Sequence, residues 1–395
     1  MTHTQADVVK GSAVSSPKGN ILIVDDTPVN LRLLSQMLTE QGYQARPAPD
    51  GPLALAAARA EPPDLILLDV RMPEMNGYEV CEHLKADAKT RDIPIIFISA
   101  LAETQDKVRA FTAGGVDYVT KPFQVEEVLA RVETHLALRR LQKKLQDANR
   151  KMEQELSLAG EVQTSFLPHE LPAIPGWQLS VTLKPARETS GDYYDVNLLP
   201  NGRLGMLVAD VVEKGVGAAL YMALSWTLIR TYAAEYPTQP ELVLGAVNRR
   251  ILGDTDANQF VTVFYGILDP VTGTLVYCNA GHCPPYLMNV QNGKGVRELI
   301  RTGIPLGILE DKTWGQKVVK LAPGDVLVFY TDGITEAQNE QGMFFGEDRL
   351  LESMRTNLGR SAQDIRDAIV ADVQRFVGDT PQVDDIALMV LVRGS

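Results

Sequence analysis

The sequence is poor in cysteine and in basic residues, and it has no long apolar run. Only three cysteines occur in 395 residues (Cys81, Cys278 and Cys283), and none forms a CxxC pair. Three thiols cannot all pair within one chain, so we expect reduced thiols and a cytoplasmic protein. The net charge of −12 argues against nucleic acid as the main partner, because binding it depends on neutralising phosphates with Lys and Arg. No apolar run approaches the ~18 residues of a membrane span, and the polar first twenty residues are not typical of a signal peptide.

Length and composition predict a soluble protein with two domains. The chain is too long for one ordinary core. Its 45% of hydrophobic and 22% of charged residues are ordinary values for a globular protein. Changes in residue pattern predict a disordered tail over residues 1–18, a first domain over 19–137, a linker helix over 138–167 and a second domain over 168–395.

The first domain alternates short apolar runs with stretches of helical spacing. The apolar runs lie at residues 21–24, 65–68, 95–98 and 116–119. Helical spacing is found at residues 29–41, 51–60, 77–85 and 104–113. Unbroken apolar runs are typical of parallel strands buried on both faces. Repeated strand–helix units predict a doubly wound α/β sheet.

The linker carries a heptad pattern. With Glu155 as the exception, its a and d positions are apolar: Leu138, Leu141, Leu145, Ala148, Met152 and Ala159. Neither glycine nor proline interrupts residues 123–159, so one long helix is predicted to join the domains, before prolines from position 168 onward end it. The helix could pack on its own domain or form a parallel coiled coil, and we favour the coiled coil in a homodimer.

The second domain contains paired strand patterns with separate helical stretches. The strands are predicted at residues 177–183, 205–210, 261–268, 274–279, 317–321, 325–330 and 386–392. The helices are predicted at residues 217–232 and 241–252 and in the region near 348–376. Strand pairs with segregated helices predict an α+β layered β-sandwich flanked by helices.

Three aspartates follow apolar strands of the first domain. Asp25 and Asp26 come directly after one strand, and Asp69 ends the next one. Ligands bind at this edge of open α/β sheets, and three carboxylates there repel one another unless a hard cation such as Mg²⁺ lies among them. A single aspartate in such a place can equally be a helix N-cap or a turn residue.

Further segments make the pattern specific. The segments ILIVDD, LLDVRMPEMNG, FISA and DYVTKPF occur in this order, and with them residues 20–137 closely resemble a two-component receiver domain, which implies a flavodoxin-like, five-stranded parallel sheet. The resemblance implies these roles: Asp69 as phosphoacceptor, Mg²⁺ held by Asp25, Asp26, Asp69 and the Arg71 carbonyl, and a switch of Ser99, Tyr118 and Lys121. It also implies a cognate histidine kinase or phosphotransfer protein as partner. A carboxylate can attack a phosphoryl donor in line while the metal and Lys121 offset the developing charge.

Acidic residues also stand at strand ends in the second domain. They are Asp192 in SGDYYD, Asp210 in GMLVAD, Asp332 in FYTDG, and the pair Asp384–Asp385. Strand ends are rigid places for ligands, and carboxylates without His or Cys suit Mg²⁺ or Mn²⁺ better than zinc. Two such ions can acidify a water and clamp a phosphate. Taken singly, an Asp-Gly pair is common turn chemistry.

Several other segments accompany these acids: EVQTSFLP, NAGHCPPYL, GIPLGI, PGDVLVFYTDGITEA and FGEDRL. Together they make residues 155–393 resemble the metal-dependent PPM (PP2C-like) phosphatases of the SpoIIE and RsbU type. The resemblance implies two Mn²⁺ or Mg²⁺ ions held by Asp192, Asp210, Asp332, Asp384 and the Val211 carbonyl. Asp385 ranks below its neighbour, and Asp195 is expected to cap local structure. For Arg187 we weigh a phosphate-binding role against a surface salt bridge, and we favour the salt bridge.

One position departs from the family pattern. The family reads Asp-Val-Ser-Gly-Lys/His-Gly after the second strand, and here Glu213 replaces the glycine. If that position needs a positive φ, Glu213 costs about 1 kcal/mol, and its carboxylate could also face the metals or repel a phosphate. His282 and Cys283 are expected to be structural, because a metal-bound water needs no His base and no activating partner for the thiol is visible.

The leading hypothesis is a response regulator in which phosphorylation of Asp69 controls a protein serine/threonine phosphatase. By resemblance, the substrate is a phosphorylated anti-anti-sigma (STAS-domain) protein in a sigma-factor partner-switching pathway of the kind used in stress responses. The alternative is a non-catalytic adaptor of the RssB type, whose degenerate phosphatase-like domain binds a sigma factor or another partner. The retained acids favour the enzyme, and Glu213 favours the adaptor. DNA binding is not expected, since the second domain has no helix-turn-helix pattern or basic stretch.

Overall fold

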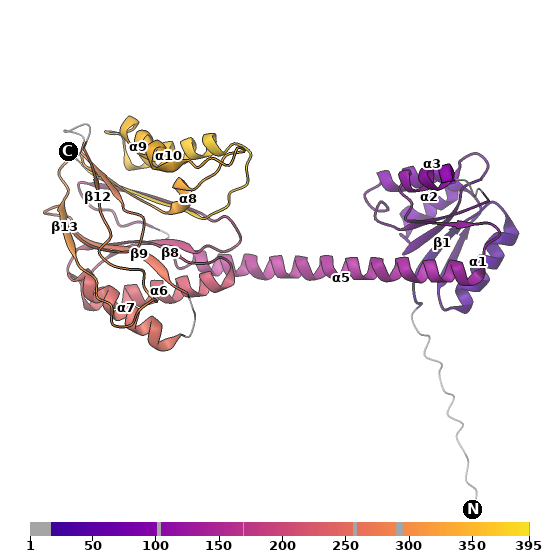
Figure 1. The fold of residues 1–395 in the computed structure, drawn as a ribbon, viewed down its shortest axis with the longest axis horizontal. Helices are drawn as coiled ribbons and strands as arrows, with labels where there is room; N and C mark the ends of the chain where they lie inside the picture. The colour runs from indigo at the N-terminus through magenta and orange to yellow at the C-terminus, as the bar shows by residue number, and fades with distance from the viewer. Residues whose placement is uncertain (1–16, 101–103, 169, 256–258, 290–294, 395) are drawn as a thin grey trace, which may run out of the picture. The chain divides into compact units, whose positions relative to one another are not determined.

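The computed structural model describes residues 17–100, 104–168, 170–255, 259–289 and 295–394. The chain separates into two compact units, residues 1–150 and 151–395, and Figure 1 follows the chain through both. The tail predicted over residues 1–18 lies outside the described residues except for Pro17 and Lys18. In this described part, no helix has both the length and the apolar character needed to cross a membrane.

The first unit is built on a five-stranded parallel sheet in the order β2-β1-β3-β4-β5. Its strands are β1 (Asn20–Val24), β2 (Gln44–Ala48), β3 (Leu65–Asp69), β4 (Ile95–Ser99) and β5 (Asp117–Thr120). Its helices are α1 (Pro28–Glu40), α2 (Gly51–Ala60), α3 (Gly77–Ala86), α4 (Thr104–Thr112) and the first part of α5 (Val125–Thr164). Helices α2, α3 and α4 bury one face of the sheet, and α1 and α5 bury the other. The predicted doubly wound fold is therefore confirmed.

One strand of this sheet was not identified from the apolar pattern. Strand β2 has the sequence QARPA, and only Ala48 in it is buried. It pairs with β1 alone and so forms an edge of the sheet, a place where proline is tolerated. Without two neighbours, such a strand needs no continuous apolar run.

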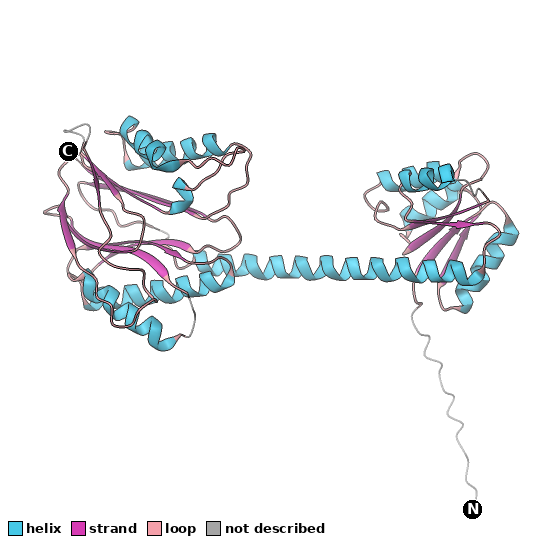
Figure 2. Ribbon diagram, viewed as in Figure 1, coloured by secondary structure: helices cyan, strands magenta, loops and turns pink. Residues whose placement is uncertain are grey.

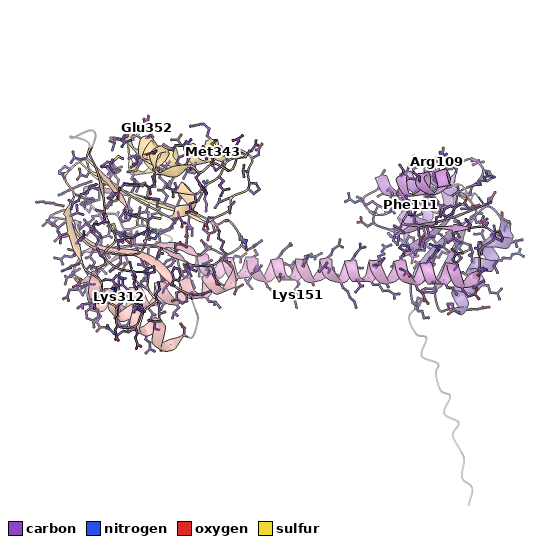
Figure 3. All side chains as sticks on the ribbon, viewed as in Figure 1. Arg109, Phe111, Lys151, Lys312, Met343 and Glu352 are labelled. Atoms are coloured by element: carbon purple, nitrogen blue, oxygen red, sulfur yellow. The ribbon has the colours of Figure 1, made fainter. Side chains whose placement is uncertain are left out.

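Helix α5 is 40 residues long. Val128, Val132 and Leu136 in its first part are buried against the sheet, whereas residues 141–155 are all exposed. Lys151, labelled in Figure 3, has one ion pair among the described residues, with Glu155 one turn later at 3.8 Å. Residues 138–164 of the segment that we assign as a linker thus belong to a helix that begins at Val125 and ends at Thr164, and the linker boundaries remain a prediction.

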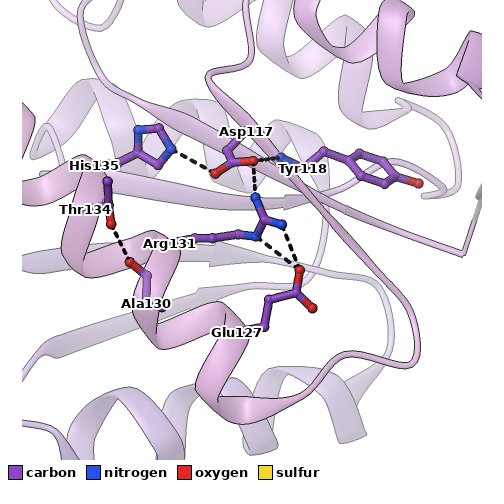
Figure 4. Close-up of polar contacts among 7 residues, drawn as sticks. All are labelled: Asp117, Tyr118, Glu127, Ala130, Arg131, Thr134 and His135. Atoms are coloured by element: carbon purple, nitrogen blue, oxygen red, sulfur yellow. Dashed lines mark hydrogen bonds and ion pairs between the residues drawn. The ribbon is translucent and has the colours of Figure 1, made fainter.

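A polar cluster fastens the start of α5 to strand β5 (Figure 4). The Asp117 carboxylate accepts a hydrogen bond from Arg131 on α5 and lies 3.0 Å from Nε2 of His135, one turn later. Arg131 also donates to Glu127, at 2.8 Å. Farther along the helix, Arg139 donates to the carbonyls of Pro63 and Asp64, at 3.0 and 2.7 Å. The beginning of the long helix is therefore held to the sheet by charged side chains as well as by apolar packing.

The second unit contains two five-stranded antiparallel sheets, in the orders β13-β10-β9-β8-β7 and β12-β11-β14-β15-β6. The first consists of β7 (Asp192–Leu198), β8 (Leu204–Val211), β9 (Val261–Asp269), β10 (Thr274–Ala280) and β13 (Lys317–Lys320). The second consists of β6 (Trp177–Lys184), β11 (Tyr286–Met288), β12 (Val296–Glu298), β14 (Val326–Tyr330) and β15 (Ile386–Arg393). The helices are α6 (Val216–Glu235), α7 (Pro240–Asp254), α8 (Asp332–Thr335), α9 (Gly346–Thr356) and α10 (Ala362–Val377).

These elements form four layers (Figure 2). Helices α6 and α7 cover the outer face of the first sheet, and α9 and α10 cover that of the second. Between the sheets, the ring of Phe264 on β9 meets that of Phe329 on β14 edge to face at 5.2 Å. Met343 and Glu352, labelled in Figure 3, are exposed near and on α9. The predicted layered sandwich flanked by helices is confirmed.

Candidate functional sites

The first candidate site lies at the carboxyl edge of the parallel sheet. Asp69 is the last residue of β3, and Asp25 follows the neighbouring strand β1. Both are buried, whereas Asp26 is exposed. One carboxylate oxygen from each of the three lies within 4.8 Å of the others, and no other trio of potential ligands in the described residues does so. All three donors are oxygens, as Mg²⁺ prefers, so this group could hold such an ion, and the Mg²⁺ site stays a prediction.

Lys121 places a positive charge on the same carboxylates. Its Nζ lies 2.8 Å from Oδ2 of Asp25 and 3.0 Å from Oδ2 of Asp69. Burial raises the pKa of Asp69, and the bond to Lys121 lowers it in part. Burial also lowers the pKa of Lys121, but its bonds to Asp25 and Asp69 outweigh that effect and leave the pKa raised. The peptide bond that follows Lys121 is cis.

The remaining predicted receiver residues lie near this edge. Ser99 ends β4 and is 1% exposed, and Tyr118 lies buried on the adjacent strand β5. Arg71 and Asp26 line a surface hollow together with Arg109 on α4, which is labelled in Figure 3. The guanidinium of Arg109 stacks 4.6 Å above the ring of Tyr78. These positions allow the roles that the resemblance implies for Ser99, Tyr118 and the Arg71 carbonyl.

The second candidate site begins at a strand pair. Asp192 on β7 and Asp210 on β8 lie directly opposite each other in the antiparallel register. Asp332 is the first residue of α8 and lies two positions after the end of β14, and Asp384 lies two positions before the start of β15. Burial, followed by the charge of Asp210, raises the pKa of Asp192 well above the ordinary value. Burial, followed by the charge of Asp332, raises the pKa of Asp210 to about 7. The structure therefore gathers these acids into one region of concentrated negative charge.

Two glycines allow the loops that carry these acids to approach closely. A Cβ atom on Gly333 would lie 1.9 Å from the carbonyl oxygen of Asp385. A Cβ atom on Gly191 would lie 2.9 Å from the carbonyl oxygen of Val211. The sequence analysis did not single out either glycine, although both stand beside a predicted ligand.

The residues present suit divalent cations with oxygen ligands. Oδ2 of the buried Asp192 has no hydrogen-bond partner among the described residues, and a buried charge is stable only when it is paired, coordinates a metal or is neutralised by a proton. The pKa values of Asp192, Asp210 and Asp332 are all raised, because burial and the negative charge of neighbouring carboxylates oppose ionisation. A bound cation would favour the ionised carboxylates. Asp384 is in contact with Lys214, whose Nζ lies 2.7 Å from its Oδ1.

Asp385 binds backbone N–H groups, whereas Asp384 pairs with Lys214. Its two carboxylate oxygens accept hydrogen bonds from the backbone N–H groups of Ala186 and Gly191, each at 2.7 Å. The side chain is buried and fastens the loop 185–191, which leads directly into Asp192. Asp385 therefore holds in place the loop that leads to Asp192, a predicted ligand.

Asp195 is structural, but it is not a local cap. Both of its oxygens accept from the Arg230 guanidinium on α6, at 2.6 and 2.8 Å. Arg230 also stacks 4.3 Å above the ring of Trp226. The pair joins strand β7 to the helix that covers it, a contact between residues too far apart in sequence for the local pattern to predict.

The roles of Arg187 and Glu213, which are close to Asp192 and Asp210 in the sequence, were left open by the sequence analysis. Arg187 is exposed in the loop 185–191, and among the described residues it takes part in no salt bridge. The surface salt bridge that we favoured for Arg187 is therefore absent from the described part.

Glu213 has a φ of 75°, so the position requires the left-handed region that glycine adopts easily. Its Oε2 accepts a hydrogen bond from Gln259 at 3.2 Å.

His282 and Cys283 have buried surroundings that suit structural roles. Nδ1 of His282 lies 2.9 Å from the Thr262 hydroxyl, and burial lowers its pKa to about 4. Burial raises the pKa of the Cys283 thiol to about 12, with a further contribution from Asp332. A neutral imidazole and a protonated thiol at pH 7 agree with the structural interpretation of both residues.

The end of helix α5 reaches the loop that leads to Asp192, which the sequence analysis did not anticipate. Gln163 is buried, and its side-chain amide donates to the carbonyl of Ser190 while its Oε1 accepts from the Ser190 N–H at 2.9 Å. One turn earlier, a Cβ atom on Gly160 would lie 2.0 Å from the carbonyl oxygen of Glu188. The long helix thus packs on the backbone of the same loop that Asp385 fastens.

Comparison with known proteins agrees with this architecture. Residues 21–133 match the model of the response regulator receiver domain, and residues 200–394 match that of stage II sporulation protein E (SpoIIE). Protein IcfG of Synechocystis is 31% identical over 268 residues, which cover 60% of this chain and 41% of IcfG. The phosphoserine phosphatase RsbU of Bacillus subtilis is 28% identical over 261 residues, which cover 66% of this chain and 74% of RsbU.

A solved structure agrees with the fold of the second unit. The SiaA-PP2C domain of Pseudomonas aeruginosa superposes with a TM-score of 0.56 at 24% identity, over 63% of this chain and 99% of that domain, which shows a shared fold. The chain spans less than half the length of the first curated relatives that it matches. From its two matched regions, its topology and its motifs, the chain joins a response regulator receiver domain to a SpoIIE-type, PP2C-like domain.

Proposed function

We propose that the second unit is a metal-dependent protein serine/threonine phosphatase. The observation that carries this proposal is the opposed pair of the buried Asp192 and the half-buried Asp210, with an unpartnered oxygen on Asp192 and the charge of Asp332 acting on Asp210. Two Mn²⁺ or Mg²⁺ ions bound there would supply an acidified water and a clamp for the phosphate. The chain's own residues would hold the ions at Asp192, Asp210, Asp332, Asp384 and the Val211 carbonyl.

The first unit would control this activity through Asp69. Its carboxylate oxygen would attack the phosphorus of a phosphohistidine on a cognate kinase or phosphotransfer protein. The P–N bond would break, histidine would leave, and an acyl phosphate would remain on Asp69. Lys121, already within 3.0 Å of Asp69, would offset the added charge, and Mg²⁺ would be held by Asp25, Asp26, Asp69 and the Arg71 carbonyl. Ser99 and Tyr118 would then respond to the phosphoryl group.

Helix α5 supports a route between the two activities. It begins on the receiver sheet and ends at Gln163, whose amide bonds the backbone of Ser190. Residues at its a and d positions, including Leu141 and Leu145, are 63–64% exposed. Such a seam would pair with that of a second copy, and we therefore propose a homodimer through the segment 138–167.

The substrate that we propose is a phosphoserine on an anti-anti-sigma (STAS-domain) protein, within a sigma-factor partner-switching pathway in the cytoplasm. The proposal draws on the relative named phosphoserine phosphatase RsbU, which matches this chain over 66% of its length. Removal of that phosphate would let the protein capture an anti-sigma factor.

Hydrolysis assays test these proposals. The wild type should hydrolyse p-nitrophenyl phosphate and a phosphorylated STAS protein with Mn²⁺, and EDTA should abolish this activity. The Asp210→Asn variant, which lacks a proposed ligand, should be inactive with Mn²⁺ as well. Acetyl phosphate should change the rate for the wild type and not for Asp69→Ala. Unchanged stimulation in Asp69→Ala would refute the proposed coupling.

A non-catalytic adaptor is the second candidate. Two observations favour it: the strained Glu213, with a φ of 75°, and the absence from the described second unit of three potential ligand atoms within 4.8 Å of one another. Absence of turnover with every divalent metal, together with tight binding of a sigma factor, would establish the adaptor and exclude the phosphatase.

A further inference from the structure

A cavity of about 220 Å³ lies next to the second acid site. Its walls come from α8, from α10 and from the loop between α10 and β15. The buried side chains of Ile334, Ile369 and Val373 form its apolar part. Asp384 lines the same cavity, so the cavity and the proposed metal site share a wall. An apolar cavity of about 150 Å³ is large enough to bind benzene, and this one can therefore take a side chain as large as Leu or Phe.

The mouth of the cavity is exposed and partly apolar. Val383, which precedes the proposed ligand Asp384, is 63% exposed. Gln382 shapes the loop here, because its side-chain amide donates to the carbonyls of Lys184 and Asp384 at 2.8 and 2.7 Å. The Thr380 hydroxyl also lines the cavity, and it is buried without a hydrogen-bond partner among the described residues. Such a group can bond the main chain of an occupant.

We propose that this cavity is a specificity pocket that receives an apolar side chain of the phosphoprotein substrate. The inference rests on the proposed phosphatase function. The phosphoserine has to reach the ions held by the aspartates, and Asp384 belongs both to that site and to the cavity wall. An extended chain advances about 3.3 Å per residue, so a side chain near the phosphoserine in sequence is the one that enters the cavity.

The pocket also explains how such a site distinguishes among phosphoproteins. The metal ions held by the carboxylates would bind a phosphate group on any polypeptide. Burial of an apolar side chain adds a contribution that depends on the neighbouring sequence. One methylene more or less in an apolar pocket changes kcat/KM by roughly 10–200-fold, so burial of a whole apolar side chain is enough to favour one substrate protein.

Phosphoserine peptides test the inference on the full-length protein with Mn²⁺. One set carries a single Leu at each of the three positions on either side of the phosphoserine, and the reference peptide carries Ser throughout. We expect one Leu position to raise kcat/KM by at least about tenfold over the reference. A ratio of two kcat/KM values cancels any general loss of activity, so it can be compared between variants.

Three variants on α10 identify the pocket. Gln374 is exposed and lines the cavity, so Gln374→Trp should fill the mouth and bring the Leu preference close to one. Gln374→Ala leaves the cavity open and should keep the preference. Gln363→Trp adds the same ring at an exposed position of the same helix outside the cavity and should also keep it.

The outcomes are distinguishable. Equal kcat/KM values for all peptides in the wild type, or a preference that survives in Gln374→Trp, would overturn the pocket inference while hydrolysis of p-nitrophenyl phosphate upholds the phosphatase. If the wild type hydrolyses neither the peptides nor p-nitrophenyl phosphate, the proposed function fails and the specificity pocket fails with it.

Discussion

Replacement of Asp385 by Asn should destabilise the second unit even when no metal is bound. The carboxylate accepts two backbone N–H groups, from Ala186 and Gly191, at 2.7 Å each. An Asn keeps one acceptor and turns its NH₂ group toward the other N–H. A hydrogen bond to a charged group contributes roughly 1.5–3 kcal/mol, and a buried donor without a partner costs roughly 1–3 kcal/mol. The free energy of unfolding should therefore fall by about 2–4 kcal/mol.

Urea unfolding in EDTA at pH 8 measures this effect. All three tryptophans, Trp177, Trp226 and Trp314, lie in the second unit, so tryptophan fluorescence reports on that unit alone. A thermal scan gives a second measurement. For a unit of this size, each kcal/mol lost from the free energy of unfolding lowers the melting temperature by roughly 2–4 °C, so the melting temperature should fall by roughly 5–15 °C.

The matched comparison is Asp210→Asn. Asp210 is a proposed ligand whose pKa is raised to about 7, first by burial and then by the charge of Asp332. Loss of its charge relieves repulsion in the metal-free protein, so this variant should be at least as stable as the wild type in EDTA. If Asp385→Asn also unfolds like the wild type in EDTA and loses only metal affinity, then Asp385 acts as a ligand and our assignment is refuted.

Three further predictions follow from the same contacts. Because the pKa of Asp210 in the folded protein is raised from 3.8 to about 7, the metal-free protein should lose stability as the pH rises from about 4 to about 7; urea midpoints in EDTA should show a smaller loss in Asp210→Asn. Gln163→Ala leaves the buried N–H and carbonyl of Ser190 unpaired, which should cost roughly 2–4 kcal/mol, whereas Ala at the exposed neighbour Glu161 should be neutral in the same measurement. Glu213→Gly removes about 1 kcal/mol of backbone strain but gives the unfolded chain more conformational freedom, so its melting temperature should stay within about 2 °C of the wild type. Glu213→Val should have a lower melting temperature. Equal melting temperatures for all three proteins would argue against the positive φ.

The sequence predicted most of the elements whose apolar pattern is continuous. Every residue of β3 and β4 is buried, and both strands were found because a parallel strand covered on both faces needs an unbroken apolar run. Strand β7 was missed for the opposite reason. Its sequence DYYDVNL is buried over its first five residues, but two of these are aspartates, and an aspartate after a glycine is typical of a turn. The buried Asp195 is paired with Arg230 on α6, and the buried Asp192 faces Asp210 on β8, so both carboxylates are surrounded by other elements.

The sequence by itself determined the two-domain organisation, the fold class of each domain and the candidate acids. These depend on periodicity and on short motifs, which are properties of neighbouring residues. The tertiary structure decided which acids are available as ligands. Asp385 is separated by 194 residues from the Gly191 N–H that it binds, and Gln163 by 27 residues from Ser190. No local pattern determines the direction of such a side chain, because that direction is fixed only when distant segments pack together and satisfy their buried hydrogen-bonding groups.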